Sequence, residues 1–186
     1  RHDQYLKRAN LTYVGKVARD IAMYMDKPKI IIDKSTVPVR TGEHVEKTIR
    51  RYLSKEIPFW VVSNPEFLRE GQAISDCLNP DRIVIGCNQE APLKVMRELY
   101  SRFPERIIET NIWSAELGKL AANGFLALSI SYANILARLC DKTGADVAQV
   151  AKIMKADRRI GPKAFLNAGI GYGGSCFPKD IAALYN

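Results

Sequence analysis

A cysteine near the end of the chain has the surroundings of a reactive thiol. Cys176 follows a glycine-rich run, residues 169–174, and stands two residues before a proline that can open a helix. Glycines let a ligand approach the backbone closely, and the positive end of a helix dipole favours a thiolate. Asp180 comes one helical turn later and can face the same cavity. Taken alone, a cysteine of this kind is more often a buried structural thiol than a nucleophile.

The glycines before Cys176 do not form a dinucleotide-binding fingerprint. Gly169, Gly171, Gly173 and Gly174 follow no predicted strand. The few residues after them cannot supply the second strand and the acidic ribose partner that the fingerprint requires. We therefore interpret this loop as one that lies close to a ligand.

A second pair of chemically useful side chains follows a predicted strand. Glu66 and Glu70 are four residues apart in the segment 64–71, which begins Asn-Pro. Asparagine caps helices and proline suits the first helical position, so we expect a short helix that presents both carboxylates on one face. Open α/β sheets build their sites at the carboxyl ends of strands. The alternative is that the two acids only stabilise a helix N-terminus.

Lys119 and Asn123 form a third pair with the same spacing, inside a long apolar segment. Polar groups in such surroundings need polar partners or a ligand. The alternative is a simple helix-surface pair of Lys119 with Glu116. The turn Ser35-Thr36 after the first strand can hold a water or a cofactor group, or can cap the turn.

Elements that could position these side chains follow from the pattern of apolar residues. In the first 110 residues short apolar runs alternate with helical patterns, which is typical of a parallel sheet covered by helices. The predicted strands are 29–33, 58–63, 82–86 and 106–109, and the predicted helices are 11–27, 41–54 and 91–101.

The pattern changes at about residue 111. Residues 113–140 contain no proline and are mostly apolar, so we expect one long central helix that is buried against other helices or a second copy of the chain. A helix over 146–155 and a last helix from about Pro178 follow. The fold class is therefore α/β: a partial doubly wound (Rossmann-like) parallel sheet in residues 1–110, followed by an all-helical domain in 111–186.

Composition limits the class of protein. The chain has 186 residues, of which 47% are hydrophobic, enough for one or two cores. No signal-peptide pattern opens it, and no apolar run approaches the ~20 residues of a membrane span. The four cysteines are widely spaced and accompany no histidine cluster, so we expect no metal site and no disulfide scaffold. We expect a cytoplasmic protein with no membrane partner.

The net charge of +8 indicates either an anionic partner or only a basic surface. The 28 basic residues are spread along the chain and not interleaved with aromatic residues as a nucleic-acid stacking surface requires. We therefore predict no nucleic-acid partner, although strongly salt-dependent DNA binding would contradict this.

Five segments, taken in order, resemble the UDP-glucose 6-dehydrogenases of the UDP-glucose/GDP-mannose dehydrogenase family. The resemblance runs from about residue 11 to the end of the chain. The segments are Ser-Thr-Val-Pro-Val-Arg-Thr-Gly (35–42), Asn-Pro-Glu-Phe-Leu-Arg-Glu-Gly (64–71), Asn-Pro-Asp-Arg-Ile-Val-Ile-Gly (79–86), Lys-Leu-Ala-Ala-Asn (119–123) and Gly-Tyr-Gly-Gly-Ser-Cys-Phe-Pro-Lys-Asp (171–180).

The resemblance implies a two-fold, NAD-dependent oxidation of UDP-glucose to UDP-glucuronate. It implies that Cys176 adds to the intermediate aldehyde to give a thiohemiacetal, whose oxidation yields a thioester. Lys119 and Asn123 would stabilise the oxyanion, and Lys119 can also accept the alcohol proton. Water must then cleave the thioester, and Glu66, Asp180 and, through a water, Thr36 match the groups that manage its protons. The resemblance does not separate the general base from the orienting acid.

It also implies which residues contact the cofactor and the substrate. NAD would be contacted by Thr36, Glu70 and Lys179. The nucleotide sugar would be contacted by Glu66, Phe67, Leu68, Lys119, Asn123, Arg159, Tyr172 and Gly173.

The family pattern is incomplete in this chain. No Gly-x-Gly-x-x-Gly precedes the first strand and nothing follows Asn186, so the first half of the NAD domain and the second nucleotide domain are missing. We therefore expect a central portion of a longer enzyme, inactive by itself, which forms a homodimer through the long helix. GDP-mannose 6-dehydrogenase or a related nucleotide-sugar dehydrogenase is the near alternative, and an inert dimerisation fragment is the alternative without activity.

Overall fold

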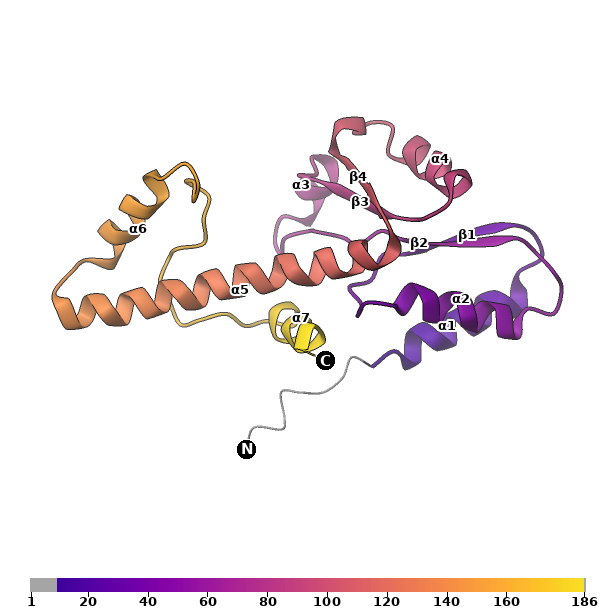
Figure 1. Ribbon diagram of the computed structural model, residues 1–186, viewed down its shortest axis with the longest axis horizontal. Helices are drawn as coiled ribbons and strands as arrows, with labels where there is room; N and C mark the ends of the chain where they lie inside the picture. Colours follow the sequence, from indigo (N-terminus) through magenta and orange to yellow (C-terminus); the bar gives the residue numbers. More distant parts are fainter. Residues whose placement is uncertain (1–9, 186) are drawn as a thin grey trace. The chain divides into compact units, whose positions relative to one another are not determined.

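A computed structural model describes residues 10–185 (Figure 1), so the first nine residues and Asn186 of the predicted domains lie outside the described part. The chain separates into two compact units that divide within one long helix, after Leu120. We call them the N-terminal unit and the C-terminal unit. The elements are α1 Thr12–Tyr24, β1 Lys29–Asp33, α2 Thr41–Tyr52, β2 Phe59–Ser63, α3 Ala73–Leu78, β3 Ile83–Gly86, α4 Glu90–Leu99, the 3-10 turn Pro104–Arg106, β4 Ile107–Thr110, α5 Ile112–Thr143, α6 Val147–Ala156 and α7 Cys176–Tyr185.

The N-terminal unit contains a four-stranded sheet in the order β1-β2-β3-β4. The predicted α/β class is confirmed, but the sheet is mixed and not wholly parallel. β1 and β2 run parallel, as do β3 and β4, whereas β2 meets β3 antiparallel through the single pair Ser63 and Gly86. The connection between β2 and β3 contains only the six-residue α3, not the long crossover helix that usually joins parallel neighbours.

Helices cover both faces of this sheet because successive strand side chains point to opposite sides. Phe59 and Val61 pack in a core with α1 and α2, whereas Val62, on the other face of β2, packs with Met96 of α4 in a second core. Figure 1 shows α1 and α2 on one side of β1 and β2, and α4 on the other side of the sheet. This is the doubly wound arrangement that the alternating sequence pattern predicts.

The predicted short helix at Asn64 is wrong. Residues 64–70 form a loop, and the next helix, α3, begins only at Ala73. In this loop the carboxylate of Glu66 accepts a hydrogen bond from the backbone N–H of Leu68 at 2.6 Å. Side-chain bonds of this kind offer the backbone an alternative to helical hydrogen bonding. Glu66 and Glu70 therefore do not share a helical face.

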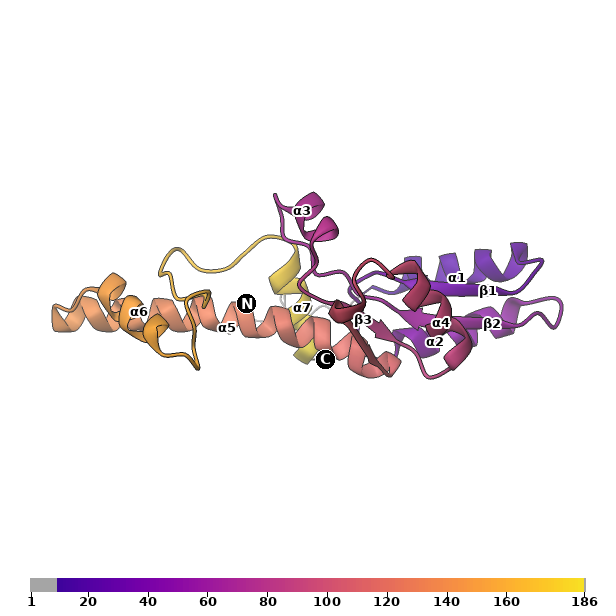
Figure 2. The same ribbon diagram turned by 90° about the horizontal axis from the view of Figure 1, so that it is seen from above.

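The C-terminal unit contains the later part of α5, with α6 and α7. Asp146 caps α6 by accepting hydrogen bonds from the backbone of residues 148 and 149. α7 lies beside α5 in both ribbon views (Figures 1 and 2), and a Cβ atom at Gly124 would lie 2.8 Å from Leu184 Cδ1. The last helix begins at Cys176, earlier than the predicted start at Pro178.

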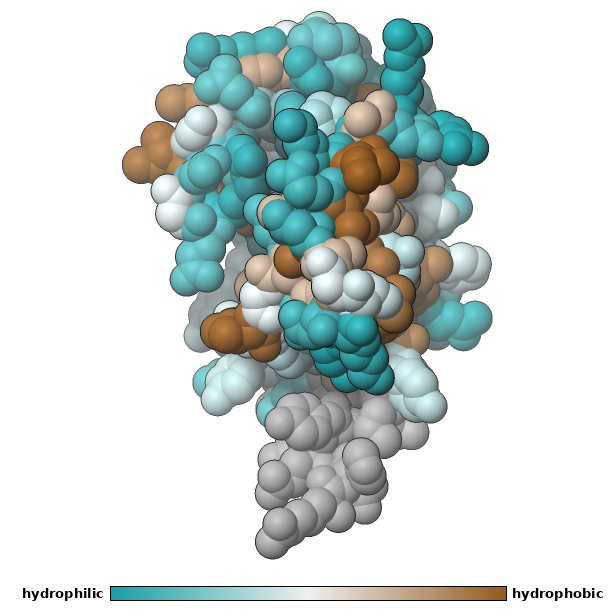
Figure 3. All heavy atoms as spheres, turned by 90° about the vertical axis from the view of Figure 1, so that its left-hand side faces the viewer, coloured by the Kyte–Doolittle hydropathy of each residue, from teal (hydrophilic) through white to brown (hydrophobic). Residues whose placement is uncertain are grey.

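Helix α5 corrects the expectation that no segment is long and apolar enough to cross a membrane. Its 32 residues include an 18-residue window of mean hydropathy 1.4, which meets that test by length and composition alone. In the C-terminal unit several of its apolar side chains are exposed at a spacing of three and four residues. These five residues, the α5 stripe, are Phe125, Leu128, Tyr132, Ile135 and Leu139. Figure 3 shows hydrophobic side chains at the surface beside hydrophilic ones on the face that it displays.

Candidate functional site

In the N-terminal unit the structure brings Glu66 and Lys119 together. Lys119 lies on α5 and is 6% exposed, and its Nζ atom is 3.8 Å from Glu66 Oε1. A buried ammonium requires a compensating charge, which this carboxylate supplies. Lys119 Nζ also lies 5.0 Å from the ring centroid of Phe67. Three residues predicted to act on the substrate thus contact one another in this unit.

The loop that carries Glu66 is fixed by a carboxylate that sequence reasoning missed. Asp76 of α3 accepts hydrogen bonds from the backbone N–H of Arg69 at 2.8 Å and from Arg69 Nε at 3.0 Å. These bonds lower the pKa of Asp76 to about 2. Arg69 lies inside the recognised segment, but its partner comes from the next element, so nothing in the motif indicated Asp76.

The ring of Phe67 is close to two cations. The guanidinium carbon of Arg82 is 3.8 Å from the ring centroid of Phe67, closer than the ammonium of Lys119. Cations favour the negative face of an aromatic ring, so both contacts hold the ring in place. Arg82 was missed as a site residue, although it belongs to the segment Asn-Pro-Asp-Arg. That segment was the signal that could have identified it.

Glu116 does not pair with Lys119 in the way the simple helix-surface alternative requires. Its carboxylate accepts hydrogen bonds from the backbone N–H groups of Arg40 and Gly42, each at 2.7 Å. It is 2% exposed, and burial raises its pKa. The partner of Lys119 is therefore Glu66, whereas Glu116 binds the backbone at the start of α2.

Thr36 lies in the turn after β1, and Glu70 lies in the loop after β2. Within residues 10–185 neither side chain has a hydrogen bond or an ion pair to another residue. Unpaired polar side chains beyond the carboxyl ends of two parallel strands occupy the place where open α/β sheets bind a dinucleotide. They fit the polar groups of such a cofactor.

In the C-terminal unit the structure brings Asn123 and Asp180 together. Asn123 Nδ2 on α5 donates a hydrogen bond of 2.5 Å to Asp180 Oδ2 on α7. Asp180 is 1% exposed, and Lys179 Nζ lies 2.8 Å from its Oδ1 atom. This ammonium is not aligned as a donor, so within the described residues Oδ1 is buried without a hydrogen bond. Such an oxygen is suited to accept a proton or a hydrogen bond from a ligand.

Cys176 is the first residue of α7, one turn before Asp180, and is exposed as a free thiol. The N–H groups at a helix N-terminus favour negative charge at this position. The loop before it needs glycine at Gly171 and Gly174, where φ is +117° and +74°. The structure thus places a solvent-accessible sulfur one helical turn before a buried carboxylate on the same helix.

The remaining predicted substrate residues are not joined to this group. Arg159 is paired with Asp157, its Nη2 atom lying 2.6 Å from Asp157 Oδ2. Tyr172 is 40% exposed and its ring meets Phe177 edge to face, with centroids 6.2 Å apart. Gly173 lies in the same exposed loop. Their predicted roles stay predictions.

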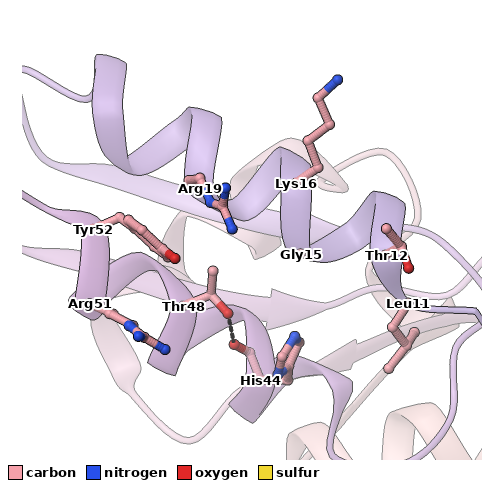
Figure 4. Close-up of a pocket in the computed structure, with 9 residues that line it drawn as sticks. All are labelled: Leu11, Thr12, Gly15, Lys16, Arg19, His44, Thr48, Arg51 and Tyr52. Carbon is pink, nitrogen blue, oxygen red and sulfur yellow. Dashed lines mark hydrogen bonds between the residues drawn. The ribbon is translucent and has the colours of Figure 1, made fainter.

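A groove of about 690 Å³ in the N-terminal unit lies elsewhere, between α1 and α2 (Figure 4). Arg19 and Arg51 approach the ring of Tyr52 there, at 4.6 and 5.7 Å from its centroid. None of the predicted site residues lines this groove, so it is separate from the candidate reactive groups. Across residues 10–185 no three His, Cys, Asp or Glu side chains are grouped to hold a metal ion.

Two family models match the chain. Residues 2–104 match the NAD binding domain of the UDP-glucose/GDP-mannose dehydrogenase family, and residues 113–186 match its central domain. The chain is 54% identical over 184 residues to UDP-glucose 6-dehydrogenase 1 of Arabidopsis thaliana. It is 50% identical over 184 residues to UDP-glucose 6-dehydrogenase 1 of Oryza sativa subsp. japonica. Each match covers 96% of this chain but only 38% of the plant protein.

Solved structures show the same fold. The chain superimposes on a UDP-glucose dehydrogenase from the hyperthermophilic archaeon Pyrobaculum islandicum with a TM-score of 0.89 and 39% identity. That match covers 95% of this chain and 41% of the archaeal one. A GDP-mannose dehydrogenase from Pseudomonas aeruginosa gives a TM-score of 0.74 and 29% identity, over 95% of this chain and 42% of the other.

Proposed function

Because the chain belongs to the UDP-glucose/GDP-mannose dehydrogenase family, we propose that it contributes the reactive cysteine and part of the NAD domain of a UDP-glucose 6-dehydrogenase. The reaction is the oxidation of the sugar C6 alcohol to an aldehyde and then to a carboxylate. UDP-glucose is favoured over GDP-mannose because two relatives named for UDP-glucose are 54% and 50% identical to this chain over 184 residues, whereas the GDP-mannose dehydrogenase is 29% identical. The chain spans 38% of those relatives, so we propose that the 186 residues alone do not turn over.

One observation carries the proposal: the exposed thiol of Cys176 lies one helical turn from Asp180, which is buried and bound to Asn123. A structural thiol would be buried, as Cys87 and Cys140 are. Exposure at a helix N-terminus is instead the environment of a nucleophilic cysteine. We also propose a cytoplasmic location, where reducing conditions keep such a thiol free.

In the proposed mechanism the sulfur of Cys176 attacks C6 of the aldehyde. A C–S bond forms, the carbonyl electron pair moves to oxygen, and the product is a thiohemiacetal. Lys119 and Asn123 stabilise the oxyanion by charge and hydrogen bonding. Removal of hydride from C6 leaves a thioester, and attack of water then breaks the C–S bond, releasing the carboxylate and the thiolate.

We assign proton transfer to two carboxylates, the buried Asp180 and Glu66, which is paired with Lys119. Asp180 has an oxygen that is ion-paired with Lys179 but accepts no hydrogen bond within the described residues, and it can take a proton from the attacking water. Glu66, next to Lys119, is the second candidate, and Thr36 would orient the water. NAD, when bound, accepts the hydride in each of the two oxidations. Thr36, Glu70 and Lys179 are the residues that we propose contact it.

The test uses a chimera in which these 186 residues replace the matching segment of the Arabidopsis relative. We expect NADH and UDP-glucuronate from UDP-glucose, and little turnover of GDP-mannose. Cys176→Ser should lower the rate by on the order of 10³-fold or more, because serine is a far weaker nucleophile. Cys77→Ser is the matched control, since Cys77 is also exposed but lies at the end of α3. Normal acid production by Cys176→Ser would contradict the mechanism.

We further propose that the α5 stripe forms a homodimer contact. Its residues recur at intervals of three and four, as in helices that pair along an apolar seam, and isolated copies expose them to water. The chain should sediment as a dimer in detergent-free buffer. Leu128→Asp with Ile135→Asp should give a monomer, whereas Asp141→Lys, on the same helix but off the stripe, should not. Retention of the dimer by the double variant, or recovery of the chain only with lipid, would exclude this contact.

A further inference from the structure

The buried carboxylate of Glu116 bridges α5 and the start of α2. Its two oxygens each accept one hydrogen bond of 2.7 Å, Oε2 from Arg40 N–H and Oε1 from Gly42 N–H. The side chain is 2% exposed, so water cannot replace these contacts. Both bonds span more than 70 residues of sequence and lie wholly within the N-terminal unit.

The start of α2 needs this carboxylate because it has no capping side chain of its own. Arg40 is the N-cap residue, makes no side-chain capping bond, and has φ +76°, a left-handed conformation that costs free energy outside glycine. The first N–H groups of a helix lack intrahelical partners. Gly42 permits the approach, since a Cβ atom there would lie 2.7 Å from Ile112 Cγ2. Glu116 therefore supplies the N-terminal cap of another helix.

The same carboxylate limits the movement of the turn that carries Thr36. At one end of that turn Asp33 Oδ1 accepts a hydrogen bond from Ser35 N–H at 2.9 Å. At the other end Glu116 holds the backbone from Arg40 onward. Thr36 itself has no side-chain partner within the described residues, so its position depends on these ties and on the hydrogen bond that Thr41 Oγ1 donates to the Pro38 carbonyl at 2.6 Å. Glu116 also precedes Lys119 on the same helix by three residues.

We propose that Glu116 is a positioning residue, which holds the Thr36 turn in a fixed relation to Lys119 by binding the Arg40 and Gly42 amides. This rests on the proposed function, because Thr36 and Lys119 matter only if the reaction is the one assigned above. Glu116 itself does not contact substrate or cofactor in this role. Its effect reaches the reaction through the backbone.

Two substitutions weaken the bridge in different ways. Glu116→Gln keeps the shape but replaces one acceptor oxygen by an NH₂ group, which cannot accept from a backbone N–H. Glu116→Asp keeps the charge but is one methylene shorter, so it cannot reach both amides. Asp141→Asn removes a carboxylate from an exposed position of the same helix and is the matched control.

The first measurement is amide hydrogen exchange in the 186-residue chain. In Glu116→Gln, exchange at Arg40 and Gly42 should rise about tenfold through local opening, while exchange at the buried β2 residue Val62 stays unchanged. Glu116→Asp should give a smaller rise at the same two amides and is the readout if the Gln variant does not fold. Unchanged exchange at both amides, or an equal rise at Val62, would overturn the proposal.

The second measurement is steady-state kinetics in the Arabidopsis chimera. Glu116→Gln should lower kcat about tenfold with KM for UDP-glucose within about twofold, and Glu116→Asp should recover part of the loss. A rise in exchange without a change in kcat would overturn the positioning role. A chimera that is inactive with native Glu116 would instead count against the proposed function, and the exchange data alone would then decide whether Glu116 holds the turn.

Discussion

The two compact units hold their proposed reactive groups by different physical means. In the N-terminal unit Glu66 lies on an irregular loop, which is kept in place by the Asp76–Arg69 contact and by the bond between Glu66 and Leu68. In the C-terminal unit Asn123 and Asp180 lie on two helices that pack closely at Gly124. A helix fixes a side chain through its regular backbone, whereas a loop needs separate side-chain bonds for each residue. The loop should therefore be the more easily disturbed of the two.

The largest expected effect concerns the helical group. Asp180→Asn should lower the rate of NADH formation in the chimera by about 10²–10⁴-fold, because it removes the buried proton acceptor. Thermal unfolding should change little, since asparagine can keep the contact with Asn123. Asp141→Asn is the control and should stay within about twofold. An Asp180→Asn variant of normal rate would remove Asp180 from the mechanism.

The next effect separates two acids of the loop. Glu66→Gln should lower kcat/KM of the chimera by about 10²-fold, because Glu66 faces the buried Lys119. Glu70→Gln should cost about tenfold or less and should act mainly on KM for NAD, because Glu70 has no protein partner in the described residues. Equal losses in kcat would show that the contact with Lys119 does not distinguish them.

A pair of glycines compares the packing of the two units. Gly86→Ala should reduce the free energy of unfolding by about 2 kcal/mol, because the new Cβ would lie 2.5 Å from Ala115 Cβ and 3.1 Å from the Asn111 carbonyl oxygen. Gly124→Ala should be close to neutral, since the Leu184 methyl group can move and alanine gains about 1 kcal/mol of helix propensity. Urea unfolding of the 186-residue chain measures both. A larger loss for Gly124→Ala would reverse the comparison.

The smallest effect is a dependence on pH. The pKa of Asp76 is lowered to about 2 by Arg69, so its stabilising contact is complete above the ordinary pKa of about 4 and is lost as pH falls toward 2. Asp76→Asn should therefore make the free energy of unfolding depend less on pH between pH 4 and pH 2. Asp157→Asn removes the more exposed pair with Arg159, so it should change the pH dependence of the free energy of unfolding less. An equal change in the pH dependence for both variants would show that the Asp76–Arg69 pair stabilises the fold no more than the Asp157–Arg159 pair does.

Much of the fold follows from local pattern. Strand and helix positions in the N-terminal unit agree with the apolar pattern to within a few residues. Burial of one helix face leaves apolar residues at helical spacing, and burial of both strand faces leaves a short continuous apolar run. The failures lie where side chains bind the backbone. Asn64-Pro65 has the residues of a helix start, yet Asp76 and Glu66 take the amides that a helix would have needed. The antiparallel pairing of β2 with β3 could not be predicted either, because the spacing of apolar residues does not depend on strand direction.

The reactive residue types, the order of the recognised segments and the spacing of Cys176 and Asp180 can all be read from the amino-acid sequence, because a helical turn is a local property. The tertiary structure decided which groups pair: Lys119 with Glu66 and not with Glu116, and Asn123 with Asp180. It also showed that Glu116, on a helix more than 70 residues further along the chain, holds the start of α2. Such contacts depend on how elements far apart in the chain pack together, and spacing along the sequence carries no record of them.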